Sequence, residues 1–129
     1  MTRTSAGPFV AAALAGLLLA ACAAPTGSAA PPPSAPPGGA VIVAQGLVFD
    51  RTRLEVPAGV GFTLLFENRE GAPHNVTILD VAGAPGFVGD TFSGPGSRTY
   101  AVPPMATGTY RFRCDVHTDM AGTVVAGAR

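Results

Sequence analysis

Charge is scarce in this sequence, and lysine is absent. Only 12% of the 129 residues are charged, and eight arginines balance eight acidic residues. A nucleic-acid-binding domain needs a basic face, so a formal net charge of zero gives no support for that class of function. The same balance produces no strong long-range electrostatic field. Any surface that docks a partner should therefore be local.

Long apolar runs are also missing. The apolar segment at residues 10–21 has 12 residues and no charge, whereas a transmembrane helix needs roughly 20. It follows Arg3 and has the form of a secretory signal. Its last residues, Leu-Ala-Ala-Cys ending at Cys22, resemble the bacterial lipobox, which implies cleavage before Cys22 and an acyl anchor on that cysteine. The alternatives are an ordinary signal cleavage with Cys22 incidental, or a disulfide between Cys22 and Cys114.

Residues 22–39 contain neither charged nor aromatic side chains and consist largely of Pro, Ala and Gly. Such a segment has nothing with which to build a core, so it is expected to be a disordered linker. The chain therefore divides into three parts. A lipoprotein signal peptide occupies 1–21, a linker with lipidated Cys22 occupies 22–39, and a folded domain occupies 40–129, long enough for one modest core.

No stretch of the folded part carries a useful helical period. Apolar and polar residues alternate instead, and turn residues recur about every ten positions, a pattern typical of an all-β sandwich or barrel. Strands are expected within 41–49, 54–56, 62–66, 76–78, 98–102, 109–114 and 123–125, with 82–96 irregular.

Histidine and cysteine are rare, and the few that exist form a pattern. The folded part has one cysteine, Cys114, and the chain has two histidines, His74 and His117. Cys114, His117 and Met120 lie at C-x2-H-x2-M spacing, and His74 lies 40 residues upstream of Cys114. Two imidazoles, a thiolate and a weak axial thioether form the ligand set of a blue-copper electron-transfer site. The spacing therefore indicates a copper centre.

Strand alternation places the thiol. Cys114 should point the same way as Tyr110 and Phe112, so it should emerge from the core face at the end of its strand. A zinc site is the alternative to copper. It would use the same thiolate and imidazoles, completed by water or by the carboxylate of Asp115 or Asp119. Methionine is a poor zinc ligand, and for that reason the pattern favours copper.

Two segments together resemble the cupredoxins, the plastocyanin, amicyanin and pseudoazurin class of small blue-copper proteins. They are Gly-Ala-Pro-His-Asn-Val at 71–76 and Gly-Thr-Tyr-Arg-Phe-Arg-Cys-Asp-Val-His-Thr-Asp-Met-Ala-Gly at 108–122. The resemblance covers about residues 40–129 and implies a Greek-key β-sandwich that holds one mononuclear copper ion. The implied ligands are His74, Cys114 and His117 around the metal and Met120 on its axis.

The resemblance also assigns supporting roles. Asn75 would not bind the metal but would connect the two ligand-bearing loops by hydrogen bonds. Such bonds orient the ligands and tune the reduction potential of the metal. Asp115 departs from the family pattern, which often has Ser or Thr after the cysteine. This leaves open how the side chain of Asn75 is paired. A carboxylate at this position would also favour Cu(II) and lower the reduction potential.

In the family the second histidine is the more exposed ligand and lies in an apolar docking patch. The corresponding patch around His117 would consist of Ala72, Pro73, Pro104, Met105, Met120 and Ala121. The alternative for Ala72, Pro104 and Met105 is that they are plain loop residues. The implied function is a monomeric electron carrier rather than an enzyme, lipid-anchored at the outer face of the cytoplasmic membrane. Its redox partner would be a cytochrome, an oxidase or a dehydrogenase. The alternative is copper delivery or tolerance, which usually relies on Met- or His-rich exposed ligands that this chain lacks.

Overall fold

Two facing β-sheets make up the folded part of the chain. The structure is a computed structural model that describes Gly7, Ser34 and residues 38–128. The expected signal peptide (1–21), the lipidation site Cys22 and most of the expected linker (22–39) lie outside the described residues. All elements of the described part are strands, and no helix within it has the length and apolar character needed to span a bilayer.

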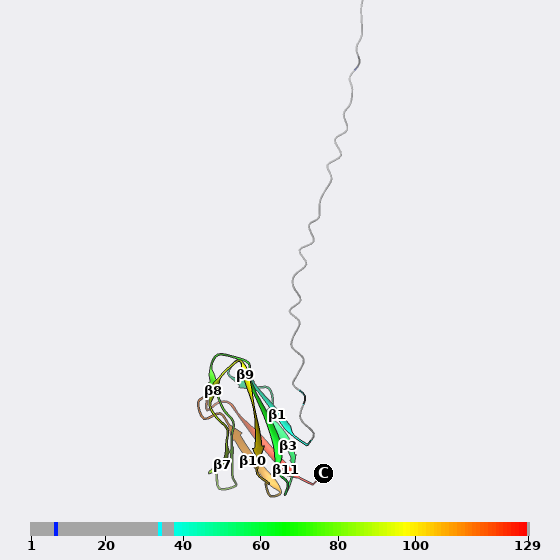
Figure 1. The fold of residues 1–129 in the computed structure, drawn as a ribbon, viewed down its shortest axis with the longest axis vertical. Coiled ribbons are helices and arrows are strands. Elements are labelled where there is room, and N and C mark those ends of the chain that lie inside the picture. Colours follow the sequence, from blue (N-terminus) through cyan, green and yellow to red (C-terminus); the bar gives the residue numbers. More distant parts are fainter. Residues whose placement is uncertain (1–6, 8–33, 35–37, 129) are drawn as a thin grey trace, which may run out of the picture. The chain divides into compact units, whose positions relative to one another are not determined.

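Four strands form the first sheet, in the spatial order β2 (Val48–Phe49), β1 (Ala40–Gln45), β4 (Phe62–Asn68) and β9 (Gly96–Val102). Five form the second, in the order β3 (Arg53–Pro57), β11 (Ala121–Gly127), β10 (Gly108–Arg113), β6 (Thr77–Leu79) and β7 (Pro85–Val88). A short pair joins β5 (Pro73–His74) to β8 (Phe92–Ser93). The pairs β1–β4 and β3–β11 are parallel, and the other described pairs are antiparallel (Figure 1). The predicted all-β sandwich is confirmed.

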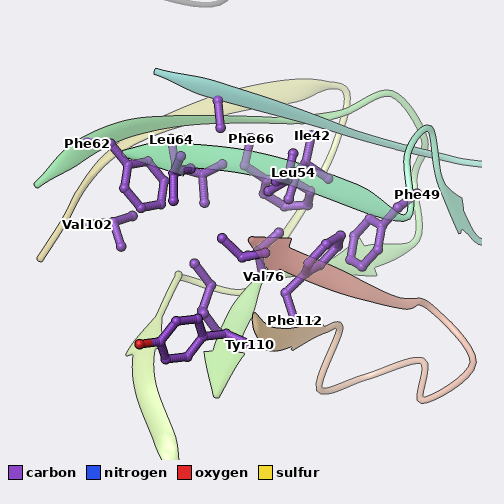
Figure 2. Close-up of a cluster of buried hydrophobic side chains, with 14 of the residues drawn as sticks. Ile42, Phe49, Leu54, Phe62, Leu64, Phe66, Val76, Val102, Tyr110 and Phe112 are labelled. Carbon is purple, nitrogen blue, oxygen red and sulfur yellow. The ribbon is translucent and has the colours of Figure 1, made fainter. Parts of the chain in front are cut away.

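The core lies between the two sheets, and strand alternation explains its position. Phe62, Leu64 and Phe66 of β4 are buried, and the residues between them are half-buried. Tyr110 and Phe112 of β10 are buried between exposed neighbours. Figure 2 shows these side chains converging from opposite layers. Successive side chains of a strand point to opposite faces, so each of these strands turns its apolar set toward the other sheet.

Two segments differ from the prediction. Residues 41–49 form a hairpin rather than one strand, because Gly46 (φ 67°) and Leu47 (φ 59°) both adopt the left-handed conformation of a tight two-residue turn. Residues 82–96, expected to be irregular, contain β7 and β8. These short strands pair with β6 and β5 through backbone hydrogen bonds. Their Gly/Pro-rich sequence has no apolar alternation that would have indicated them.

One end of the sandwich carries the loops of interest, and we call it the site end. The strands β4 and β10 both finish there, at Asn68 and Arg113. The strand β1 begins toward the opposite end, since Ala40 pairs with Leu64 while Ala44 pairs with Asn68. In Figure 1 the site end, with β8, lies uppermost, and β11 finishes at the lower end.

Gly122 should be intolerant of any side chain. A Cβ at this position would lie 2.6 Å from Phe112 Cε1 and 2.6 Å from the carbonyl oxygen of Thr52. We expect Gly122→Ala to lower the free energy of unfolding by about 1–3 kcal/mol, because overpacking a tight core forces its neighbours to move. Gly127→Ala is the matched control, since a Cβ there meets no atom within 4 Å. Equal urea midpoints for the two variants would contradict this expectation.

Candidate metal centre

Three predicted donor atoms meet at the site end. Cys114 Sγ lies 3.9 Å from His74 Nδ1 and 3.9 Å from His117 Nδ1, and the two nitrogens lie 3.2 Å apart. His74 comes from β5, whereas Cys114 and His117 come from the loop after β10. The fold therefore closes the 40-residue gap between His74 and Cys114.

This triangle has the size of a metal site. With metal–nitrogen bonds of about 2.0–2.1 Å and metal–sulfur bonds of about 2.3 Å, one ion reaches nitrogens up to about 4.1 Å apart and a sulfur–nitrogen pair up to about 4.4 Å apart. The observed separations of 3.2 and 3.9 Å fall within both limits, so the three atoms are close enough together for one ion to reach all of them. A thiolate with two imidazoles, next to a methionine, is a soft donor set that fits copper better than zinc.

Met120 closes the loop that carries the other two donors. Its carbonyl accepts a hydrogen bond from the Cys114 N–H at 2.9 Å, and its own N–H donates to the His117 carbonyl at 3.0 Å. Its side chain is buried, with 2% exposure, within the core cluster. The short C-x2-H-x2-M spacing thus produces a compact loop, anchored at one end by a strand and at the other by a buried side chain.

The donors differ in their access to solvent. His74 and Cys114 are fully buried, each with 0% exposure, while His117 is only partly buried. Cys114 is a free thiol. Its burial agrees with strand alternation, because Tyr110 and Phe112 are buried on the same face. Only the imidazole of His117 in this triangle is open to approach from outside.

Asn68 braces the loop that leads to His74, and sequence reasoning did not identify it. Its side chain is fully buried, and its Nδ2 donates to the carbonyls of Ala72 at 2.8 Å and Phe92 at 2.9 Å. Its Oδ1 accepts from the Glu70 N–H at 3.1 Å. These three hydrogen bonds fix the loop, because any other loop conformation would leave the buried amide of Asn68 without partners.

Glu70 was also missed, and it contacts a donor directly. Its Oε1 lies 2.7 Å from His74 Nε2 and accepts a hydrogen bond from the Leu47 N–H at 2.9 Å; its Oε2 accepts from the Gly46 N–H at 2.9 Å. The Leu47 N–H chiefly, with His74 and Gly46, holds the pKa of Glu70 below its ordinary value. An Nε2–H that donates to this carboxylate leaves Nδ1 as the free donor toward the metal. An acidic residue four positions before His74 was the available signal.

Truncating Glu70 should therefore weaken metal binding. We expect Glu70→Ala to lose about 10- to 100-fold in affinity, the usual cost of removing a partner that orients a ligating histidine. Competition with a chelator measures this loss. Glu55→Ala is the control, since Glu55 is an exposed acid whose described partner is Arg53. Equal affinities of the two variants would show that Glu70 does not orient His74.

The question of how Asn75 is paired has a clear answer. Its Nδ2 donates to Asp115 Oδ2 at 2.9 Å, and its Oδ1 accepts from the Asp115 N–H at 2.8 Å. The donations from Asn75 and then from the Thr77 hydroxyl hold the pKa of Asp115 below its ordinary value. Asn75 thus ties the two ligand-bearing loops together, and Asp115 supplies the acceptor where the family often has a hydroxyl.

Met105 does not lie with the other members of the predicted docking patch. It precedes β10, whereas the donor loop follows it, and the six residues of β10 span roughly 17 Å at about 3.4 Å per residue. Together with Pro104 it lines a cavity of about 300 Å³ near Tyr110, at the far end of the sandwich. The prediction that Met105 and Pro104 adjoin His117 is therefore corrected. Both residues are apolar, but they lie in the loop between β9 and β10, at the end of the sandwich opposite the donors.

Pro73 and Ala121 do lie at the site end. Pro73 is exposed and pairs with Ser93, next to His74. Ala121 is partly buried and begins β11, opposite Arg113. Val116, which was not predicted, adds an aliphatic side chain with 45% exposure beside His117. The surface next to His117 is thus partly apolar.

Comparison with known proteins gives a consistent picture. The family described as Cupredoxin-like domain matches residues 10–126. Chloroplastic plastocyanin of Pisum sativum is 40% identical over 81 residues, which is 56% of this chain and 46% of that protein. The chain thus spans about half the length of the pea protein.

Solved structures extend the comparison to the fold. Reduced auracyanin from the photosynthetic bacterium Roseiflexus castenholzii has a TM-score of 0.63 at 22% identity, covering 73% of this chain and 99% of auracyanin. The Cu(I) form of an amicyanin variant has a TM-score of 0.55 at 28% identity, covering 70% of this chain and 83% of amicyanin. The first likeness concerns the fold alone. The second comes from a protein solved with copper.

Proposed function

This chain belongs to the cupredoxin-like family, and from that premise we propose that it is a monomeric blue-copper protein that carries single electrons between redox proteins. The observation that carries the proposal is the triangle of Cys114, His74 and His117 donors, followed on the same loop by buried Met120. Copper held by these residues supplies a one-electron couple between Cu(I) and Cu(II). The likeness to amicyanin in its Cu(I) form supports this choice of metal.

The surroundings of the donors suit electron transfer. His74 and Cys114 are fully buried, so the protein excludes water from most of the site. Hydrogen bonds accepted by the Glu70 carboxylate and by Asn75 Oδ1 hold the donor loops in place. A partner would approach at the partly exposed edge of His117, where the neighbouring surface is partly apolar. We propose a cytochrome, an oxidase or a dehydrogenase as that partner.

The burial of the donors also favours electron transfer over copper delivery. A delivery protein must release its ion to another protein, which requires accessible ligands. Here two of the three donors of the triangle have no exposed surface, and a strand end and a buried methionine hold the loop between them. Both histidines of the chain belong to this one site. We therefore propose a carrier with no catalytic step of its own.

We further propose that the protein is exported and lipid-anchored through Cys22 at the outer face of the cytoplasmic membrane. The sequence supports this arrangement, because the uncharged apolar run at residues 10–21 ends in Leu-Ala-Ala-Cys at Cys22, which resembles a lipobox. Mass analysis of membrane-extracted protein should find acyl chains on Cys22. An unmodified mature N-terminus at another residue would refute the anchor.

Addition of Cu(II) to the purified protein tests the function. We expect a strong blue band from thiolate-to-copper charge transfer, and we expect the bound copper to be reduced and reoxidised reversibly by one electron. Zinc serves as the comparison metal in a competition titration. A colourless copper complex, or tighter binding of zinc than of copper, would refute the electron-carrier function.

A further inference from the structure

Asp115 connects the two loops that carry the donors. Its Oδ2 accepts hydrogen bonds from the Thr77 hydroxyl at 2.5 Å and from Asn75 Nδ2 at 2.9 Å, and its backbone N–H donates to Asn75 Oδ1 at 2.8 Å. Asn75 directly follows His74, and Asp115 directly follows Cys114. One residue therefore engages both ends of the Asn75 amide and fixes the separation of two donors.

The groups that Asp115 serves are buried. Asn75 has 2% exposure and Thr77 has 1%. The other acceptors within reach of Asn75 Nδ2 are more distant, at 3.3 Å for the Gly89 carbonyl and 3.4 Å for the Thr77 hydroxyl. A buried donor that loses its acceptor carries the full penalty of its desolvation. Asp115 Oδ2 is thus the acceptor that keeps the buried donors of Asn75 and Thr77 paired.

The second carboxylate oxygen faces outward. Asp115 Oδ1 accepts from Arg113 Nε at 3.0 Å, and both side chains are partly exposed, at 35% and 46%. A serine or threonine hydroxyl has a single oxygen and cannot divide its contacts between the buried donors and the arginine in this way. The carboxylate therefore joins three elements, namely β6, the loop after His74 and the end of β10.

We propose that Asp115 is a positioning residue that clamps the two donor loops, which means that its hydrogen bonds hold them at a fixed separation. Its negative charge also sets the electrostatic potential at the thiolate. The clamp holds Cys114 against His74 through Asn75. A negative charge next to Cys114 stabilises the more positive metal state, so it lowers the reduction potential. Arg113 partly offsets that charge from the solvent side. The clamp consists of hydrogen bonds within the protein and does not require a metal, whereas the effect on the reduction potential rests on the proposed copper function.

Four variants of the full chain separate these effects. Asp115→Asn removes the charge and keeps the shape, while Asp115→Ser tests whether a single hydroxyl is sufficient. Arg113→Gln leaves the inner hydrogen bonds intact and removes the outer cation. Arg111→Gln is the matched control, because Arg111 is an exposed arginine on the same face of β10. The measurements are copper affinity, reduction potential, melting of the metal-free protein, and hydrogen exchange of the Asn75 side-chain amide.

We expect both Asp115 variants to melt at lower temperature without metal and to exchange the Asn75 amide faster than the control. With copper, Asp115→Ser should lose about 10- to 100-fold in affinity, as removal of contacts that hold the ligand loops usually does. Asp115→Asn should lose less, because its amide oxygen can still accept hydrogen bonds. Asp115→Asn and Arg113→Gln remove opposite charges next to the site, so they should shift the potential in opposite directions: Asp115→Asn should raise it and Arg113→Gln should lower it. A purely structural residue would not produce this reversal of sign.

Different results would overturn different parts. If the Asp115 variants match Arg111→Gln in metal-free melting and in Asn75 amide exchange, the clamp is refuted. If Asp115→Asn and Arg113→Gln shift the potential in the same direction, the electrostatic part is refuted. If the wild-type protein binds no copper, the proposed function fails. The metal-free melting and amide exchange still decide the clamp in that case.

Discussion

Cys114→Ser is expected to abolish the blue absorption that Cu(II) produces with the wild-type protein. Cys114 Sγ lies 3.9 Å from each donor nitrogen and is the only sulfur of the triangle, so the charge-transfer band depends on it. A serine hydroxyl is a hard, weakly acidic oxygen and does not replace a soft thiolate as a copper ligand. Serine nearly matches cysteine in volume, so the fold should persist. A visible spectrum and a urea melt on the same sample measure both outcomes.

Cys22→Ser is the matched control for this experiment. It removes the other cysteine of the chain, which the structure does not describe and which the site does not use. The blue band should survive in this variant, and copper affinity should equal that of the wild type. A band that persists in Cys114→Ser, or that disappears in Cys22→Ser, would contradict the assignment of the thiolate.

The thiol could be placed from the sequence because the signal for it is local. Alternation over 109–114 puts Cys114 on the face of Phe112, and the structure buries both fully. The short spacing to Met120 likewise predicts one loop. The approach of His74 to Cys114 is a contact over 40 residues, and no periodicity encodes it. That part of the site was predicted from the rarity of histidine and the chemistry of the donor set, and from resemblance to a family whose fold closes the gap.

What the sequence did not reveal depends on long-range contacts or on single hydrogen bonds. Glu70 acts through the turn at Gly46 and Leu47, 24 and 23 residues away, so its role appears only once β1 and β4 are paired. Met105 has the apolar side chain expected of a docking residue, but it lies before β10, at the end of the strand opposite the donors. The strand β8 consists of two residues held by backbone pairing with β5. Side-chain patterns carry no information about such a strand.

Phe112→Ala should cost the metal-free protein about 3–5 kcal/mol of unfolding free energy, the usual cost of truncating a fully buried phenylalanine. Phe112 has 0% exposure, and its ring centroid lies 5.4 Å from that of Phe49. Figure 2 shows its ring between the two layers. Gly122 leaves the space that this ring fills, so neighbouring backbone would have to move before the cavity could close. Denaturation in urea measures the loss.

Phe92→Ala is the comparison variant, because Phe92 is only partly buried and contacts Phe66 at the edge of the core. It should cost less than Phe112→Ala, and equal losses would contradict the central place of Phe112. The position of Phe112 adds a consequence for the site, since Cys114 lies two residues further along the same face. A cavity beneath that strand end should loosen the thiolate relative to His74. We therefore expect Phe112→Ala to weaken copper binding as well, although its side chain is not a ligand.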